Sequence, residues 1–113
     1  MKKIEAIIKP FKLSQVKEAL HELGISGMTL VDVKGFGRQR GSTGGIDPND
    51  GYDDEFLAKM KLEVIVEDNQ VDEVIKSIKS SAYSGKIGDG KIFVSNIEQV
   101  IRIRTGEKDS DAV

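Results

Sequence analysis

Five basic side chains are the residues of this chain best suited to bind an anion. They occupy three separate segments, which hold Arg38, then Lys86 and Lys91, and then Arg102 and Arg104. Arginine and lysine both pair with phosphate oxygens, arginine through a planar fork and lysine as a point charge. Their concentration in an otherwise acidic chain favours a phosphate-bearing ligand, and a nucleotide is the natural candidate.

The first segment, Gly35-Phe36-Gly37-Arg38-Gln39-Arg40-Gly41, follows a predicted strand. A dinucleotide fingerprint needs a G-x-G-x-x-G pattern that opens a helix, whereas here the spacing is off by one and no helical pattern follows. The glycines would instead form a tight turn that lets backbone N–H groups and Arg38 approach an anion. A plain turn without a ligand is the alternative.

The second segment, Ser84 to Lys91, contains a literal G-x-x-x-x-G-K. It is no Walker A loop, because Ile92 replaces the magnesium-binding Ser or Thr and a predicted helix, rather than a strand, precedes it. Three glycines and two lysines still suit a backbone cradle for phosphates. A solvated hairpin loop explains the same residues equally well.

The third segment, Val100 to Arg104, is predicted to be a strand. Arg102 and Arg104 are two residues apart, so a strand would place both on one face, about 7 Å from each other. That spacing would let both reach one polyphosphate. The alternative is an exposed strand edge with no ligand.

Catalytic and metal-binding motifs are missing from the sequence. The chain has no cysteine and one histidine, His21, which lies on the helix face opposite the leucines and is expected to be a surface residue. No nucleophile with an adjacent base is visible. Residues 47–51 resemble the start of a calcium loop, but Gly51 falls one position too early and flanking helices are missing. We therefore expect a binding protein and not an enzyme.

Length and composition predict one soluble domain. The chain has 113 residues, with 38% hydrophobic and 32% charged residues, which is ordinary for a folded protein. Its net charge of -2 argues against a nucleic-acid binder. No apolar run approaches the roughly 20 residues of a membrane-spanning helix, and no secretory signal opens the chain. We therefore expect a cytoplasmic protein without direct membrane insertion.

Hydrophobic periodicity predicts strands and helices in a repeated order. Strand patterns alternate every second residue and helix patterns recur every three to four residues. The predicted strands cover residues 4–8, 28–33, 60–66, 91–94 and 100–104, and the predicted helices cover 13–23 and 71–78. Two strand-helix-strand units in one small domain indicate an α+β fold of the ferredoxin-like split βαβ type, an antiparallel sheet with both helices on one face.

Two further features concern the surface. The region from Gly41 to Asp54 has turn signals and no apolar periodicity, and together with the adjoining Glu55 it holds five acidic residues. These features predict a long, flexible, anionic loop. The sheet face without helices would carry Ile7, Val31 and Ile65 among charged residues. We expect that face to be covered by further copies of the chain, most simply in a closed ring.

Four stretches of the sequence resemble the PII nitrogen-regulatory signal proteins. They are Met1–Leu13, Val33–Gln39, Gly85–Phe93 and Val100–Glu107, and the resemblance covers nearly the whole chain outside the central loop. It implies a single PII-like domain over residues 1–113, with the long loop at about 37–58 and a polar C-terminal tail at about 106–113. We expect the tail to fray from Glu107.

The resemblance also implies a homotrimer of ferredoxin-like subunits that binds ATP or ADP in three clefts between subunits. By similarity, one subunit would hold the nucleotide through Thr29, Gly35, Phe36, Gly37, Arg38, Gln39 and Ile65. The neighbouring subunit would close on it with Gly88, Asp89, Gly90, Lys91, Arg102 and Arg104.

A second ligand, 2-oxoglutarate, is implied in the same way. Together with the ATP phosphates it would coordinate Mg²⁺, with Gln39 as the matching protein ligand of the metal. Residues Arg40 and Gly41 would lie near this ligand, and Lys59 would pair with its distal carboxylate. Since ADP cannot complete the Mg²⁺ site, metabolite binding would depend on the nucleotide, with a coupling of about 1–3 kcal/mol.

The resemblance implies partners as well, such as an ammonium transporter or enzymes and regulators of nitrogen metabolism, on which the loop would dock. In that loop the chain departs from the family, because Thr43–Tyr52 is one residue longer than the usual stretch and carries no arginine. Tyr52 aligns with the tyrosine that is uridylylated in some members and is a candidate modification site. The acidic loop leaves the target open.

Two alternatives to a 2-oxoglutarate sensor follow. One is a PII-like, nucleotide-responsive regulator of a transporter or of carbon metabolism that does not sense 2-oxoglutarate. The other is a small phosphoryl-transfer enzyme of ferredoxin-like fold, which the sequence disfavours because it lacks a pocket histidine.

Overall fold

The two central strands form because apolar and charged residues alternate along them. The computed structural model of the chain describes residues 1–36 and 57–113. Its strand β1 (Lys2–Ile8) pairs antiparallel with β3 (Leu57–Val66). Every second residue points to the same side of the sheet, and most of these residues are buried there. These buried residues are Ile4, Ala6, Ile8, Leu62, Val64 and Val66.

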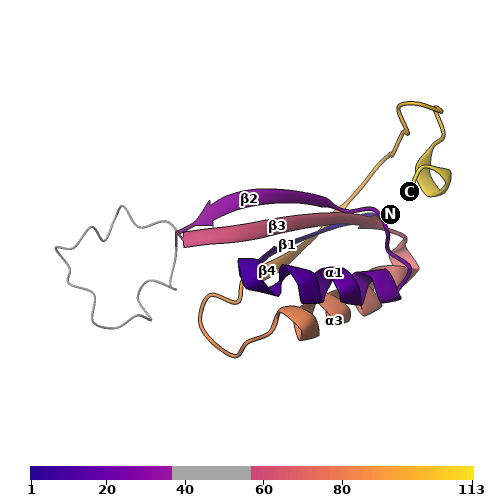
Figure 1. Cartoon of the computed structure of the whole chain (residues 1–113). Helices are drawn as coiled ribbons and strands as arrows, with labels where there is room; N and C mark the ends of the chain where they lie inside the picture. The colour runs from indigo at the N-terminus through magenta and orange to yellow at the C-terminus, as the bar shows by residue number, and fades with distance from the viewer. Residues whose placement is uncertain (37–56) are drawn as a thin grey trace.

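Two edge strands complete the sheet, in the order β2-β3-β1-β4 (Figure 1). Strand β2 (Thr29–Gly35) pairs with β3, and β4 (Lys91–Asn96) pairs with β1, both antiparallel. With one helix after β1 and one after β3, this confirms the predicted ferredoxin-like α+β fold.

Both helices cover the same face of the sheet (Figure 1). Helix α1 (Leu13–Glu22) begins after a 3₁₀ turn that Pro10 opens, and it ends before Gly24, whose φ of +84° suits glycine. Helix α3 (Val71–Ala82) follows a 3₁₀ turn closed by a capping box between Glu67 and Gln70. None of the helices in the described residues is long and apolar enough to cross a membrane.

The opposite sheet face carries charges in a regular pattern. Along the strands, Lys3 lies 3.1 Å from Glu5 and Lys61 lies 3.6 Å from Glu63. Between the strands, Lys3 and Glu63, and Lys61 and Glu5, form ion pairs of 3.9 Å. The strand register places Ile7, Val31 and Ile65 on this face, as predicted. No element in the described parts of the chain covers it.

The predicted strand at 100–104 is wrong. Only Ile101 pairs, in an isolated bridge to Lys108, and a turn follows at 103–105. The Arg102 N–H donates to the Glu107 carbonyl at 2.8 Å, and the Gly106 N–H donates back to Arg102 at 2.8 Å. The chain reverses here because Gly106 adopts a φ of +74°, which a strand cannot continue.

The expected fraying from Glu107 is wrong as well. A 3₁₀ turn at Asp109–Asp111 folds the tail back, and the Asp109 N–H donates to the Val100 carbonyl at 2.8 Å. The Asp109 carboxylate accepts a hydrogen bond from the Val100 N–H at 3.1 Å. The polar residues of the tail are therefore used as hydrogen-bond partners of its own hairpin.

Several strands and one helix are longer than the sequence predicted. Strand β2 reaches Gly35, α3 reaches Ala82 and β4 reaches Asn96. Strand β3 begins at Leu57, so the last two residues of the predicted loop at 37–58 belong to a strand. The rest of that loop lies outside the described residues.

Candidate functional site

A cavity of about 400 Å³ opens at one end of the helix-free sheet face. That size lies within the range of roughly 300–1,000 Å³ typical of small-molecule sites. Its walls come from the ends of all four strands and from the loop between α3 and β4. The lining residues are Ile7, Gly35, Phe36, Leu57, Lys59, Ile87, Gly88, Gly90, Lys91 and Phe93.

Six predicted binding residues meet in this cavity, namely Gly35, Phe36, Lys59, Gly88, Gly90 and Lys91. They come from both glycine-rich segments, which are far apart in the sequence. The strand register explains the meeting, since Gly35 pairs with Leu57 while Ile7 pairs with Lys91. The resemblance implied that Gly88, Gly90 and Lys91 act on the nucleotide from a neighbouring subunit. In one chain these three residues line the same cavity as Gly35 and Phe36.

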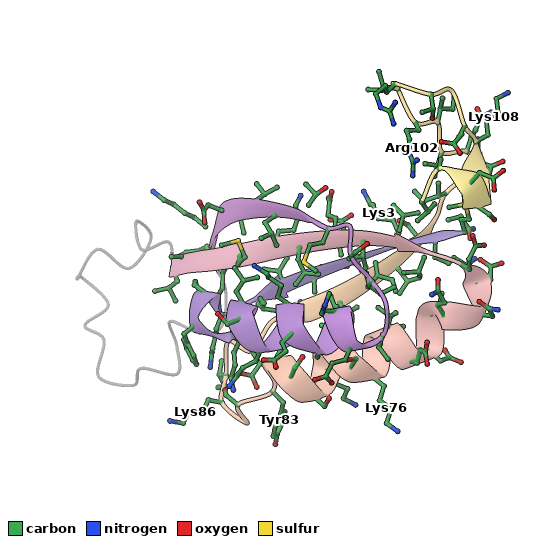
Figure 2. All side chains as sticks on the ribbon, turned by 45° about the vertical axis from the view of Figure 1, so that its right-hand side comes forward. Lys3, Lys76, Tyr83, Lys86, Arg102 and Lys108 are labelled. Carbon is green, nitrogen blue, oxygen red and sulfur yellow. The ribbon has the colours of Figure 1, made fainter. Side chains whose placement is uncertain are left out.

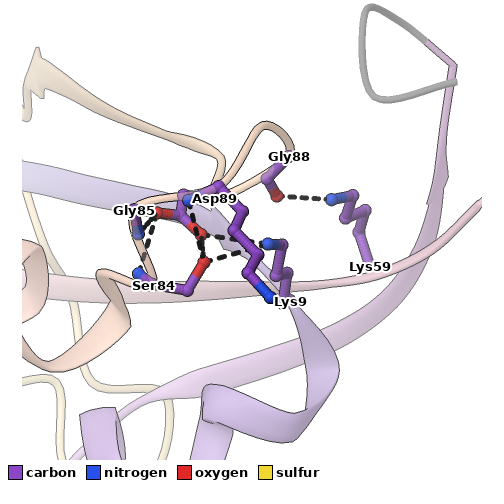
Figure 3. Close-up of polar contacts among 7 residues, drawn as sticks. Lys9, Lys59, Ser84, Gly85, Gly88 and Asp89 are labelled. Atoms are coloured by element: carbon purple, nitrogen blue, oxygen red, sulfur yellow. Dashed lines mark hydrogen bonds and ion pairs between the residues drawn. The ribbon is translucent and has the colours of Figure 1, made fainter. Parts of the chain in front are cut away.

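Lys59 supplies a buried positive charge to the cavity wall. Its ammonium donates a hydrogen bond of 2.6 Å to the Gly88 carbonyl (Figure 3). Within residues 1–36 and 57–113, no carboxylate forms an ion pair with it. Burial lowers the pKa of Lys59, and the nearby charge of Lys9 lowers it further against the opposing effect of Asp89. An ammonium held by one neutral acceptor is well suited to receive an anionic group of a ligand.

The loop that carries Gly88 and Gly90 is organised around the Asp89 carboxylate. This carboxylate accepts hydrogen bonds from the Ser84 N–H at 2.8 Å, the Gly85 N–H at 2.9 Å and the Ser84 hydroxyl (Figure 3). The Lys9 ammonium lies 3.1 Å away. Burial by itself would raise the pKa of Asp89, but these hydrogen bonds outweigh it and hold the pKa far below its ordinary value.

Asp89 itself does not line the cavity. The residues that line the cavity include its neighbours Gly88 and Gly90 but not Asp89 itself. Its oxygens are occupied by donors of its own loop and by Lys9. In a single chain this carboxylate is thus an internal hydrogen-bond acceptor, and its binding of nucleotide stays a prediction.

Gly90 is required by close backbone contact. Its φ is +102°, and a Cβ placed on it would lie 1.6 Å from the Ile7 carbonyl oxygen. A real Cβ cannot approach a backbone atom so closely, so only glycine allows the loop to lie against β1. Gly88, with a φ of +98°, likewise adopts a conformation that favours glycine.

Four other predicted residues lie elsewhere in the chain. Thr29 pairs with Glu63, and Ile65 pairs with Lys3, so both lie on the helix-free face but away from the cavity. Arg102 and Arg104 belong to the C-terminal hairpin. Figure 2 shows Arg102 and Lys86 at opposite ends of the molecule. Within one chain, the segment with Arg102 and Arg104 therefore does not meet the other basic segments at the cavity.

The remaining predicted residues lie outside the described residues. They are Gly37, Arg38, Gln39, Arg40, Gly41 and Tyr52, and they include the predicted magnesium ligand. In the parts of the chain that the structure describes, no group of three or more His, Cys, Asp or Glu side chains could hold a metal ion.

Sequence reasoning missed Lys9 and several apolar lining residues. Because Lys9 immediately precedes Pro10, the sequence predicted only the end of a strand there. In the structure the Lys9 side chain is buried, with 8% of the residue exposed. Ile7, Leu57 and Phe93 could have been found, because the period of two along their strands places them on the same face as Lys59 and Lys91.

Known proteins resemble this chain along its whole length. The family model described as "Nitrogen regulatory protein P-II" matches residues 1–107. The "Nitrogen regulatory protein P-II" of Azospirillum brasilense is 58% identical over 113 residues, and that of Pasteurella multocida is 57% identical over 113 residues, with 100% of each chain covered. A crystal structure of Arabidopsis thaliana PII bound to citrate matches with a TM-score of 0.82 and 43% identity, over 99% of this chain and 91% of that chain. The matched region includes every lining residue of the cavity.

Proposed function

Because the chain belongs to the nitrogen regulatory protein P-II family and is a signal-transduction protein rather than an enzyme, we propose that its cavity binds ATP or ADP and, with Mg-ATP, 2-oxoglutarate. Proteins of this family bind small-molecule effectors, and the Arabidopsis relative is described as bound to citrate, a polycarboxylate. Our proposal assigns the effectors of this chain to the cavity between the two glycine-rich segments.

One observation carries the proposal, namely the buried Lys59 ammonium beside the backbone of Gly88 and Gly90. Phosphate and carboxylate groups bind to positively charged side chains and to backbone N–H groups that they can approach closely, as at glycines. Lys91 adds a second cation to the same wall. The described residues thus fit an anionic ligand.

The position of the arginines supports a site shared between subunits. Neither Arg102 nor Arg104 lines the cavity, and Figure 2 shows Arg102 at the end of the molecule opposite to Lys86. Arg102 could therefore reach a nucleotide bound in the cavity only from another copy of the chain. The helix-free face, with its apolar residues among ion pairs, offers a surface for such copies. We propose a homotrimer in which the hairpin of one subunit completes the cavity of the next.

Magnesium would bind jointly to ATP and 2-oxoglutarate, with Gln39 as the protein ligand and with Arg40 and Gly41 nearby. When bound, the ion would supply octahedral coordination by oxygen and so make the two ligands depend on each other. Lys59 fits the role of partner for the distal carboxylate, because its ammonium faces the cavity without an acidic partner among the described residues.

The output would be the docking of the loop after residue 36 on protein targets in the cytoplasm. An ammonium transporter and enzymes or regulators of nitrogen metabolism are the proposed target classes. Tyr52 is the proposed modification site. The acidic character of the loop predicts that its target presents a basic surface.

Calorimetric titration tests the effectors. We expect 2-oxoglutarate to bind in the presence of Mg-ATP and not of Mg-ADP, and the Lys59→Met substitution to weaken that binding at least about tenfold. Lys76→Met, on the exposed face of α3, controls for the loss of one positive charge. Binding of ATP without any response to 2-oxoglutarate would overturn the sensor proposal and favour a regulator that responds to nucleotide alone.

A further inference from the structure

We propose that Lys9 and Asp89 act as a pair of positioning residues that hold the glycine loop in the shape needed for anion binding. Neither side chain would contact the ligand. This inference rests on the proposed function for its effect on nucleotide affinity, but its structural part concerns the free protein.

The pair is built from the end of β1 and the loop before β4. The Lys9 ammonium lies 3.1 Å from Asp89 Oδ1 and donates a hydrogen bond of 3.0 Å to the Ser84 hydroxyl (Figure 3). The Lys9 side chain is nearly buried. Asp89 also accepts from the backbone N–H groups of Ser84 and Gly85. One carboxylate thus closes the loop on itself and fastens it to β1.

Three consecutive loop residues are held by three different contacts. The Gly88 carbonyl accepts from Lys59 of β3, and Asp89 pairs with Lys9. Gly90 lies against the backbone of Ile7, where no Cβ would fit. The first and third of these residues line the cavity, so the pair at the second residue determines how their backbones face it. Pre-organisation of this kind lowers the entropy lost on binding.

The electrostatics of the pair also matter for an anion. Asp89 neutralises Lys9, which leaves Lys59 and Lys91 as the cations on the cavity wall. Removal of the Lys9 charge alone would leave a partly buried carboxylate without its ammonium, next to the residues that receive the ligand. Removal of the Asp89 charge alone would leave a nearly buried ammonium without its carboxylate. Either single change is expected to displace the loop, whereas removal of both charges leaves no unpaired ion.

A double-mutant cycle tests this inference with Mg-ATP as the probe. Lys9→Met and Asp89→Asn should each weaken Mg-ATP binding about tenfold or more, and the double variant should lose much less than the product of the two effects. Lys9→Arg should keep affinity within about threefold of the original protein, because it retains the charge and its hydrogen bonds. Lys76→Met should leave affinity unchanged. A double variant that loses the full product would mean that Lys9 and Asp89 act independently on binding, and it would overturn the inference.

Hydrogen exchange in the ligand-free protein gives a second readout that needs no nucleotide. Lys9→Met should speed the exchange of the amides in residues 84–91 while the exchange in β1 and β3 stays unchanged, and Lys9→Arg should restore slow exchange. Equal exchange in the original protein and in Lys9→Met would overturn the inference. If the original protein fails to bind Mg-ATP, the proposed nucleotide site fails, and the exchange data alone decide whether the pair organises the loop.

Discussion

The Lys59 ammonium donates a hydrogen bond of 2.6 Å to the Gly88 carbonyl, and this contact joins β3 to the loop that follows α3. The same ammonium faces the cavity between the two glycine-rich segments. A ligand carboxylate that pairs with Lys59 would therefore be placed beside Gly88. Binding of such a ligand would thus be linked to the position of the loop through the Lys59 side chain.

The binding of a dicarboxylate should depend on pH through Lys59. Burial, followed by the charge of Lys9, lowers its pKa below the ordinary value of 10.5. Only the ammonium form attracts a carboxylate, so calorimetric affinity for 2-oxoglutarate with Mg-ATP should fall as the pH rises into a range where an ordinary lysine keeps its proton. Lys59→Arg keeps its charge over this range, and any affinity it retains should not show the fall.

The stability of the free protein should move in the opposite direction. Since the pKa of Lys59 is lowered on folding, the unfolded chain binds this proton more tightly than the folded chain does. The contribution of Lys59 to the free energy of unfolding therefore rises with pH between the folded and unfolded pKa values. Denaturant unfolding of the original protein and of Lys59→Met over this range measures the effect. Parallel curves for the two proteins would contradict it.

Gly90→Ala should damage both the loop and the fold. Its Cβ would lie 1.6 Å from the Ile7 carbonyl oxygen, and the φ of +102° would strain any other residue. We expect a loss of about 2–4 kcal/mol in the free energy of unfolding and at least tenfold weaker Mg-ATP binding. Gly27→Ala is the matched control, because nothing lies within 4 Å of a Cβ there. An unchanged melting temperature for Gly90→Ala would show that the loop does not lie against β1.

Local patterns in the sequence predicted most of the fold. The alternation of Ile4, Ala6 and Ile8 requires a strand with one buried face, and Gly24 marks the end of α1 by its left-handed backbone. The segment at 100–104 shows the limit of such patterns. Its alternation fits both a strand of the sheet and one arm of a short hairpin. The positive φ of Gly106 turns the chain back and produces the hairpin.

The candidate site was predicted by residue type more reliably than by orientation. Glycines and lysines close together in the sequence predicted an anion site. The structure brings three glycines, two lysines and Phe36 of the predicted set to one cavity, because the strand register places Gly35 and Lys91 at the same end of the sheet. The sequence cannot tell which way a carboxylate points. The sequence therefore did not show that the Asp89 carboxylate pairs with Lys9, a residue that the sequence analysis did not single out.

The N-terminus should contribute to stability in a pH-dependent way. The α-amino group of Met1 lies 2.9 Å from Asp68 Oδ1, and this hydrogen bond and charge lower the pKa of Asp68. A carboxyl group whose pKa is lowered on folding stabilises the protein above its unfolded pKa and loses this effect as the pH falls through the folded pKa. Asp68→Asn should therefore lower the melting temperature near neutral pH and approach the original protein in acid. Asp32→Asn, on the exposed edge strand, provides the control.

Mixed assemblies should show whether two chains form one nucleotide site. Lys91 lines the cavity of its own chain, whereas Arg102 lies at the other end and pairs with Glu107 at 3.1 Å. If Arg102 acts on the cavity of a neighbour, Lys91→Ala and Arg102→Ala should each weaken Mg-ATP binding, because each removes one half of every site. Assemblies refolded from both variants together should regain some tight sites, since an intact Lys91 then meets an intact Arg102 from another chain. Calorimetry on the mixed assembly, after size-exclusion chromatography, should resolve this high-affinity fraction. The absence of tight sites from the mixture would place both residues in the site of a single chain, or Arg102 outside it, and would contradict a shared cleft.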